Sequence, residues 1–511
     1  MSSGIVDTPS AVTPLAPVAL VVLDGRSTGA DDIVRLADGT ARPVPGTDAM
    51  KRAEESWGAA RRIAATGRVY GRSTGVGANR NEDVPSEAAA DHGLRLLRSH
   101  AGAIGAELPA RQIRAMLAVR ANQLLAGGAG LRPTVVTALC AALESGAHPV
   151  VNEFGSVGTG DIAALAQVGL ALAGEHPWRG PDGSPAGTPE PLALDNNDAL
   201  ALISSNALTL GQSALALHEL RGLIGATQVV AALSLLAVDG SHEAYAAPVH
   251  AARPHRGSVE VARRMRELTG AADRPTPPLG RIQDPYGFRC LPQIHGPAHD
   301  AADALEAVLA VEINAAAENP LICPEDMAAY HHGGFYQAQL ALALDHFRLA
   351  VTQVARLSTS RLSTLNEPAY TRLRPFLADH EPAASGVMIL EYAAGAALGD
   401  LRAFSAPASL GHAVLSRGVE EQASFASLAA RQTLRACGAY RLVVGCELVA
   451  AVRALRQRDL RPDQGLPAAR ALELAEAVLD AEHADRPLTD DVAAAAALLD
   501  RFTDIWRGTT S

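Results

Sequence analysis

Hydrophobic residues recur every three or four positions over most of the chain, the spacing that places them on one face of an α-helix. The pattern starts near Asp31. It is clearest in two runs, Ile113, Met116, Leu117, Leu124 and Val135, Val136, Leu139, Leu143. Five later segments are long enough for several turns, namely 213–238, 299–317, 335–362, 388–405 and 420–455. These segments predict an all-α fold built around long helices.

Other patterns interrupt the helical one. The β-branched run "VALVVLDG" (Val18 to Gly25) predicts one short strand near the start. Connectors rich in Pro and Gly run from His176 to Pro191 and from Arg274 to Phe288. Residues 1–16 are rich in Ser, Thr and Pro and are predicted to be a disordered tail. We expect a mixed, loop-rich N-terminal domain at 17–210, followed by a helical bundle and a C-terminal helical region at 211–511.

The most apolar stretch, Gly222 to Gly240, is open to two interpretations. It has about the minimum length for a membrane span, but it carries a Gln. We favour a buried central helix of the bundle, since a helix that is apolar on all sides belongs in a core.

Charge and cysteine usage narrow the classes of function. The chain has 511 residues and a net charge of −11, and it has no basic cluster of the kind that neutralises nucleic-acid phosphates. Five cysteines without CxxC spacing favour a reducing compartment and no zinc or other metal site. The N-terminus lacks the positive region of a signal peptide. These features predict a cytoplasmic protein acting on small molecules, with no nucleic-acid or membrane partner.

The segment "GSVGTGDIAALAQ" places a glycine-rich loop directly before an amphipathic helix whose predicted N-cap is Asp161. A helix N-terminus presents free N–H groups, which stabilise developing negative charge. The alternative is a glycine-rich turn with no other role.

Two further stretches carry candidate chemistry. "VYGRSTGVG" (Val69 to Gly77) lacks the Lys-Ser/Thr of a phosphate loop, so a loop that carries Tyr70 into a pocket is the better interpretation. In "IQDPYGFRC", Gln283, Tyr286 and Arg289 share one face if the segment is helical. Arg289 then suits bidentate capture of a carboxylate, although an interhelix salt bridge is the commoner role. The adjacent His331 and His332 do not face one metal site, and we expect them in a loop.

Taken in order, these stretches resemble the aromatic amino acid ammonia-lyases, most closely the histidine branch. The matching landmarks run from "LDGRS" through "VYGRSTGVG", "LRSHAGAIGAELP", "QDPYGFRC", "EINAAAENPL" and "GGFYQAQ" to "SGVMILEY". The resemblance implies the long helical bundle of those enzymes. It also implies a homotetramer in which three subunits build each active site.

The resemblance also implies roles for single residues. In the family, an Ala-Ser-Gly loop cyclises into a methylidene-imidazolone electrophile, whose methylene comes from the Ser. A Tyr matching Tyr70 removes a proton, an Arg matching Arg289 holds the substrate carboxylate, and residues matching Gln283 and Tyr286 position the substrate. Further matches to residues that recognise the substrate side chain or line the pocket are His100, Glu420 and Phe335.

The sequence departs from the family at the electrophile. The loop is one residue short, leaving Gly158, Thr159 and Gly160, so either the Ser is deleted or Thr159 takes its place. The family's cofactor-binding Asn is replaced by Ser204, with Asn206 two residues on. Its Gly-Asn-Phe-His run becomes Gly333 to Tyr336. We therefore predict that the usual cofactor is absent.

The resulting hypothesis is a carbon-nitrogen lyase of this fold that uses Tyr70 as acid/base, with Tyr286 as proton donor or oxyanion partner. Thr159 is the remaining reactive group of the loop. The reaction is an elimination, addition or ring closure on a small, amino-acid-like carboxylate. We expect the enzyme to belong to secondary metabolism. Two alternatives stay open: an ordinary ammonia-lyase or aminomutase with a Thr-derived cofactor, and a non-catalytic ligand-binding relative.

Overall fold

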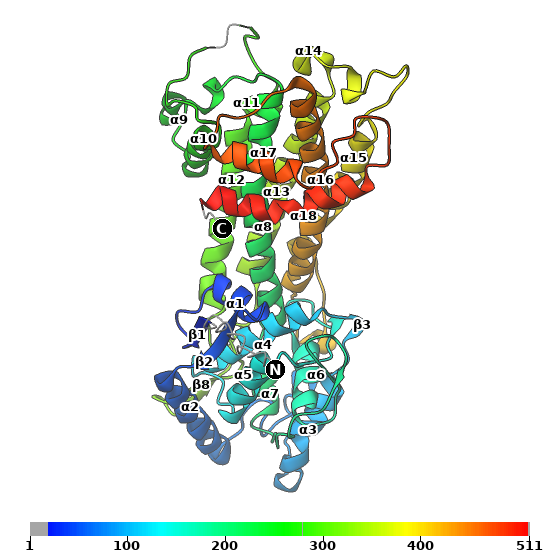
Figure 1. Ribbon diagram of the computed structural model, residues 1–511. Coiled ribbons are helices and arrows are strands. Elements are labelled where there is room, and N and C mark those ends of the chain that lie inside the picture. Colours follow the sequence, from blue (N-terminus) through cyan, green and yellow to red (C-terminus); the bar gives the residue numbers. More distant parts are fainter. Residues whose placement is uncertain (1–18, 278–279, 509–511) are drawn as a thin grey trace, which may run out of the picture.

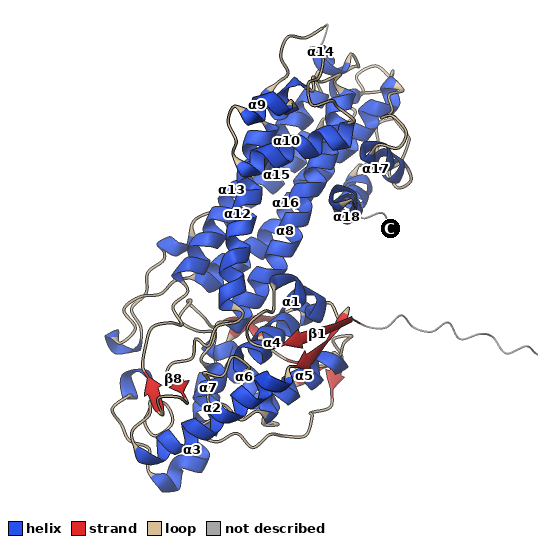
Figure 2. Ribbon diagram, turned by 90° about the vertical axis from the view of Figure 1, so that its left-hand side faces the viewer, coloured by secondary structure: helices blue, strands red, loops and turns tan. Residues whose placement is uncertain are grey.

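The computed structural model describes residues 19–277 and 280–508 and is markedly elongated (Figure 1). Long helices connect a mixed region at one end to a purely helical region at the other. Figure 2 shows the strands confined to the mixed end. The 1–16 tail predicted above lies outside the described residues.

The mixed end is formed by the first third of the chain and a later hairpin. Its helices are α1 (Ala30–Ala37), α2 (Thr47–Thr66), α3 (Ala89–His100), α4 (Ala110–Leu124), α5 (Thr134–Ser145), α6 (Ile162–Leu172) and α7 (Ala199–Ile203), with the 3-10 turns η1 (Gly77–Asn79) and η2 (Ser86–Ala88). Its strands are β1 (Ala19–Leu23), β2 (Ala41–Pro45), β3 (Ile104–Glu107), β4 (His148–Pro149), β5 (Asn152–Phe154), β6 (Trp178–Arg179), β7 (Pro185–Ala186), β8 (Leu321–Cys323) and β9 (Ala328–Tyr330).

The strands form small separate sheets. The predicted N-terminal strand is confirmed as β1, which pairs in parallel with β2 from Ala19↔Ala41 to Leu23↔Pro45. The antiparallel sheets are β3 with β5, β4 with β6 and β7, and β8 with β9. None is large enough to organise the core, so the all-α prediction is confirmed.

The remaining helices form the bundle and its far end. They are α8 (Ala207–Ala237), α9 (Ala247–Ala251), α10 (Arg256–Thr269), α11 (Tyr286–Arg289), α12 (Leu291–Glu312), α13 (Ala338–Leu365), α14 (Pro368–Thr371), α15 (Ile389–Phe404), α16 (Ala426–Arg458), α17 (Pro467–Glu476) and α18 (Thr489–Arg507), with the 3-10 turns η3 (Glu243–Tyr245), η4 (Pro375–Leu377), η5 (Ala408–Leu410) and η6 (Ser416–Gly418).

Helix α8 is the centre of the bundle. It packs against α16, α4, α12, α13 and α18, and nearly all of its side chains are buried. The predicted buried central helix is therefore confirmed. Among the described residues, 199–237 is the one helical segment long and apolar enough to cross a membrane, and 89% of its most apolar window is buried inside the molecule.

Several helix boundaries differ from the sequence pattern, and the starts of α12 and α16 are two of them. Helix α12 begins at Leu291 and continues through Pro297, because buried positions such as Leu291, His295 and Ala298 extend its apolar face. Helix α16 begins only at Ala426, after Phe425 in the left-handed conformation (φ 54°). Glu420 therefore lies in a loop and not in the first turn of a helix.

Asp161 fixes the two helices nearest the glycine loop relative to each other. It is the N-cap residue of α6, as predicted, but its side chain does not cap that helix. The carboxylate instead accepts hydrogen bonds from the backbone N–H (2.8 Å) and hydroxyl (2.9 Å) of Thr209, in the first turn of α8. A buried carboxylate thus stabilises the start of the central core helix.

Candidate active site

A cavity of about 390 Å³ opens at the mixed end of the molecule, where the glycine loop before α6, the Tyr70 loop and the loop before α16 meet. It gathers six of the predicted site residues, Tyr70, Thr159, Gly160, Ser204, Phe335 and Glu420. These residues are separated by up to 350 positions in the sequence, so their convergence supports a common site.

The glycine loop is fixed by hydrogen bonds to the start of α16. The hydroxyl of Ser424 donates to the Gly158 carbonyl (2.8 Å) and the N–H of Phe425 donates to the Val157 carbonyl (2.8 Å). Within the loop, the hydroxyl of Ser156 donates to the Gly160 carbonyl (3.0 Å) and accepts from the Gly158 N–H (3.1 Å). The loop is therefore held in one shape on both sides of Thr159.

Both glycines of the loop are required by the backbone. Gly158 has φ +91° and Gly160 has φ +114°, a region that residues with a Cβ rarely adopt. A Cβ on Gly158 would lie 2.2 Å from the Ser424 hydroxyl oxygen and 2.8 Å from the Phe425 nitrogen. Position 158 therefore excludes the alanine that opens the family's cofactor loop.

These observations test whether the loop fits the family's electrophile. That group needs a serine to supply its methylene, and residues 158–160 contain none. The residues present do not fit the usual group.

Thr159 and Glu420 face each other in the cavity. The hydroxyl of Thr159 lies 3.5 Å from a carboxylate oxygen of Glu420. Glu420 is held in its loop by paired backbone hydrogen bonds with Leu415. A hydroxyl and a carboxylate thus lie side by side in the cavity, next to the glycine loop.

Tyr70 lies at the wall of the same cavity. Its phenol oxygen accepts a hydrogen bond from the Gly77 N–H (2.7 Å), and its ring makes an edge contact with His331 at 6.3 Å between centroids. Burial is the main cause that raises the pKa of Tyr70 above 10, and the nearby Glu420 carboxylate adds to it. The phenol is therefore protonated at neutral pH, whereas a tyrosine base needs a lowered pKa.

The side chains of Ser204 and Asn206 form hydrogen bonds with the backbone of residues that line the cavity. The Ser204 hydroxyl accepts a hydrogen bond from the Asn319 N–H (3.0 Å). The Asn206 side-chain amide donates to the Phe335 carbonyl (2.8 Å), and its carbonyl oxygen is buried with no partner among the described residues. Both side chains thus position neighbouring residues of the site.

Four predicted site residues lie elsewhere in the chain. The three from one segment, Gln283, Tyr286 and Arg289, lie in or next to α11 at the far end of the bundle (Figure 1). Tyr286 is 65% exposed, and the Arg289 guanidinium stacks on its ring at 4.3 Å. Tyr286 to Arg289 form a helical turn, and Gln283 lies outside it.

The length of helix α13 gives the distance between α11 and the cavity. Its N-terminus follows Phe335 in the site, whereas Arg361, near its other end, donates a hydrogen bond to the carbonyl of Gly287 in α11 (3.3 Å). At 1.5 Å per residue, the 23 positions from Ala338, the first residue of the helix, to Arg361 span about 35 Å. The α11 residues and the cavity of one chain therefore cannot bind the same small molecule.

His100 is also outside the lining of the cavity. It ends α3, and its Nδ1 lies 2.9 Å from both the Leu96 carbonyl and the Ser99 hydroxyl. The histidine is thus tied to its own helix in this chain.

The cavity also contains residues that were not among the predicted site residues, chiefly Arg80, Asn319 and His331. Arg80 follows the "VYGRSTGVG" run, and Asn319 belongs to "ENPL". Their closeness in sequence to these motifs is the feature that could have indicated them as site residues. His331 lines the cavity, but His332 turns away and its Nε2 bonds to the Glu318 carbonyl (2.8 Å). Across 19–277 and 280–508, no cluster of three or more His, Cys, Asp or Glu side chains is arranged to hold a metal ion.

Known proteins are similar to this chain in sequence and in fold. The chain is 35% identical over 443 residues to histidine ammonia-lyase of Geobacillus kaustophilus, covering 84% of this chain and 87% of that protein. It is 30% identical over 452 residues to the Bacillus subtilis enzyme, covering 86% and 89%.

Two solved structures superpose over nearly the whole chain. Tyrosine aminomutase from Streptomyces globisporus matches with a TM-score of 0.89 and 26% identity, covering 96% of this chain and 98% of that one. The ergothioneine-degrading enzyme ergothionase from Treponema denticola, in complex with desmethyl-ergothioneine sulfonic acid, matches with a TM-score of 0.88 and 25% identity, covering 95% and 99%. The aromatic amino acid lyase family model matches residues 29–478. Because the family model spans most of the chain and relatives at least 30% identical cover more than four fifths of it, the chain belongs to the aromatic amino acid lyase family.

Proposed function

We propose that this protein is a carbon-nitrogen lyase that works without the methylidene-imidazolone electrophile and transfers protons through Tyr70. The observation that carries the proposal is the Gly158-Thr159-Gly160 loop, which lacks the serine and leaves no room for a Cβ at position 158. The loss of the electrophile coincides with changes at its contacts, Ser204 and Gly334, whereas Tyr70 and Arg289 are kept.

In the proposed elimination, the Tyr70 oxygen takes a proton from the carbon next to the one that carries nitrogen. The electrons of that C–H bond form the double bond, and the C–N electrons leave with the amine. The Gly77 N–H, 2.7 Å from the phenol oxygen, stabilises the phenolate that must exist before the step. Addition is the same sequence in reverse, and ring closure replaces the amine by a nucleophile of the substrate.

Substrate binding requires a second chain in this proposal. Arg289 is suited to anchor the carboxylate and Tyr286 to donate a hydrogen bond, but α11 lies about 35 Å along α13 from the cavity. We propose a homotetramer in which α11 of one subunit closes the cavity of another.

The lost electrophile also restricts the leaving group. An electrophile activates an amine by bonding to the nitrogen lone pair, and a quaternary ammonium has no lone pair. Such a group leaves as a neutral amine without further activation. The likeness to ergothionase makes ergothioneine, whose nitrogen is quaternary, the first substrate to test.

Two outcomes compete with this proposal. One is an ordinary histidine or aromatic amino acid lyase or aminomutase with a ring derived from Thr159, and the relatives named above favour histidine as its substrate. The other is a non-catalytic relative that binds a ligand.

Intact mass and a substrate panel decide among the three. We expect the mass of the unmodified chain, and turnover of a quaternary substrate that Tyr70→Phe lowers at least about 100-fold. A mass lower by two waters, mapped to 158–160, together with ammonia release from histidine, tyrosine or phenylalanine, would establish the ordinary enzyme. Ligand binding without any turnover that depends on Tyr70 would establish the non-catalytic relative.

A further inference from the structure

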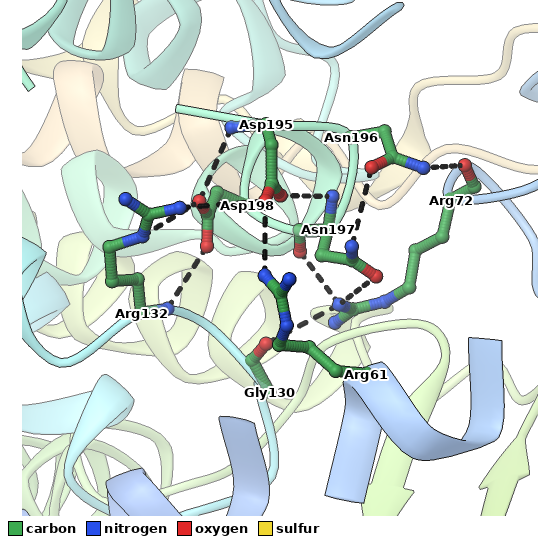
Figure 3. A network of polar contacts seen from close by, with 8 residues as sticks. All are labelled: Arg61, Arg72, Gly130, Arg132, Asp195, Asn196, Asn197 and Asp198. Atoms are coloured by element: carbon green, nitrogen blue, oxygen red, sulfur yellow. Dashed lines mark hydrogen bonds and ion pairs between the residues drawn. The ribbon is translucent and has the colours of Figure 1, made fainter. Parts of the chain in front are cut away.

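Arg72, two residues after Tyr70, is a buried cation with no carboxylate within ion-pair distance among the described residues. Its side chain is 2% exposed. Its guanidinium donates to the backbone carbonyls of Asn197 (2.7 Å), Ala129 (2.7 Å) and Gly130 (3.3 Å), as Figure 3 shows in part. Burial lowers its pKa to about 10, and the surrounding acids oppose that change. Burying an unpaired charge is unfavourable. If position 72 served only to fill space, an apolar residue would therefore stabilise the fold more than arginine does.

The segment that accepts Arg72 also bonds back to it. The side-chain amide of Asn196 donates to the Arg72 carbonyl (2.6 Å), and that of Asn197 donates to the Asn196 side chain (3.3 Å). The turn is itself fixed, because the Asp198 carboxylate accepts N–H groups of Arg132 (3.1 Å) and Asp195 (3.3 Å) (Figure 3). The side chain and the backbone carbonyl of Arg72 are thus both clamped to the 195–198 turn.

This clamp joins two walls of the cavity. Residues 195–198 lead directly into α7, which presents Leu200 to the cavity and ends at Ser204. Gly71, between Tyr70 and Arg72, has φ +70°, and a Cβ there would lie 2.1 Å from a methyl carbon of Leu200. The Tyr70 loop and α7 are therefore packed together without spare room.

We propose that Arg72 is a positioning residue that holds Tyr70 at a fixed place against the α7 wall of the cavity. It acts through geometry: its contacts are with backbone and amide groups on the far side of the loop, whereas the Tyr70 hydroxyl is met by Gly77. The proposal rests on the proposed function in so far as Tyr70 transfers the proton.

The kinetic test uses whichever probe the wild type turns over, with ergothioneine tried first and histidine second. We expect Arg72→Met to lower kcat about 100-fold, the cost of misplacing a reacting group by about 1 Å, with KM changed less than about threefold. Arg72→Lys, which keeps the charge and can reach one carbonyl, should recover part of kcat. The control Arg61→Met removes an exposed arginine of the same network and should change kcat by less than about threefold.

A double variant separates positioning from general stability. If Arg72 acts through Tyr70, Arg72→Met costs nothing more in the Tyr70→Phe background. An equal loss in both backgrounds, or a loss no larger than that of Arg61→Met, would overturn the proposal.

Hydrogen exchange tests the clamp even without a substrate. Arg72→Met should speed amide exchange in 69–77 and 195–203 but leave α12 unchanged, while Arg61→Met leaves all three unchanged. If Arg72→Met unfolds the chain, Arg72→Lys takes its place in the comparison. A wild type that turns over no probe counts against the proposed function alone, whereas unchanged exchange in 69–77 counts against the role of Arg72.

Discussion

Thr159 carries the only side chain of the 158–160 loop, and its hydroxyl reaches the cavity beside Glu420. Two chemistries follow from that one residue. If it has formed a ring with its neighbours, it is the reactive centre. If it has not, it supplies at most a hydrogen bond, which is worth about 0.5–1.5 kcal/mol.

The substitution Thr159→Ala distinguishes these cases. Without the electrophile we expect kcat/KM to fall no more than about tenfold, the effect of one hydrogen bond. The control Tyr70→Phe should lose at least about 100-fold, because it removes the proton-transferring group. A Thr159→Ala enzyme as inactive as Tyr70→Phe would indicate a Thr-derived cofactor.

Gly158 and Gly183 form a matched pair for measuring how tightly the loop is packed. Both have positive φ, +91° and +80°, but a Cβ on Gly183 would have no neighbour within 4 Å, whereas one on Gly158 would meet Ser424 and Phe425. We expect Gly183→Ala to lower the free energy of unfolding by about 1 kcal/mol, the cost of the left-handed conformation alone.

Gly158→Ala should cost about 1–3 kcal/mol more than Gly183→Ala, because the added methyl forces the backbone of α16 to shift. Chemical unfolding of the two variants measures the difference. Equal costs would show that the loop can relax, and would weaken the steric argument against an alanine at position 158.

The raised pKa of Tyr70 predicts the pH dependence of the reaction. Burial keeps the phenol protonated at neutral pH, so only a small fraction is the phenolate that accepts a proton. If the phenolate is the base, kcat/KM rises about tenfold per pH unit from pH 7 toward 10. A profile that is flat over this range, with Tyr70→Phe inactive, would identify the neutral phenol as the required form.

At the scale of elements, a polar contact fixes the last helix to the bundle. The Gln228 side chain, in α8, joins His299 of α12 (2.8 Å) and Trp506 of α18 (3.3 Å), and the His299 and Trp506 rings stack at 5.3 Å. Burial lowers the pKa of His299 from 6.5 to about 4. The neutral ring accepts the Gln228 amide, and protonation removes that acceptor.

This contact predicts loss of stability in mild acid. The unfolded chain takes up a proton on His299 below pH 6.5, whereas the folded chain does so only near pH 4. The stability is therefore complete above about pH 6.5 and falls by about 3 kcal/mol as the pH decreases to 4. Thermal or urea unfolding between about pH 4 and 7.5 measures it. His299→Gln should flatten that part of the dependence, and an unchanged slope would show that other groups cause it.

At the scale of the whole molecule, the predicted site residues form two sets at opposite ends of the helical bundle. One set lines the cavity, and the other lies in or next to α11. The α11 turn is fixed there by Arg361, which bonds to the Gly287 carbonyl and forms a buried ion pair with Glu447. Tyr245 adds a hydrogen bond to the Phe288 carbonyl (2.9 Å). These contacts hold Tyr286 and Arg289 in place at a surface of the chain, where a second subunit can be met.

Mixing inactive subunits tests the proposed sharing. Tyr70→Phe and Arg289→Met should each be inactive, but co-expressed in equal amounts they should regain about a quarter of the wild-type activity, because random assembly leaves that share of shared sites intact. Co-expression of Tyr70→Phe with Tyr70→Ala is the control, since two changes at one position leave every site defective. No recovery in the Tyr70→Phe and Arg289→Met mixture would mean that the sites are not shared in this way.

The sequence by itself determined the helical class, the first strand, the buried central helix and the family, because all of these depend on local periodicity or on ordered motifs. It also identified Tyr70, Thr159, Ser204, Phe335 and Glu420, since each lies in or near such a motif. Their convergence in one cavity is a property of the fold.

Only the tertiary structure decided what depends on contacts between distant segments. It placed Glu420 in a loop and not on α16, directed the Asp161 carboxylate to α8, and brought Arg80 and His331 into the cavity. It separated α11 from the cavity along the length of α13 and bound Arg72 to a turn more than 120 residues away. Local sequence encodes which helices form. The packing of those helices decides which side chains share a site, and how far burial shifts the pKa of each titratable group.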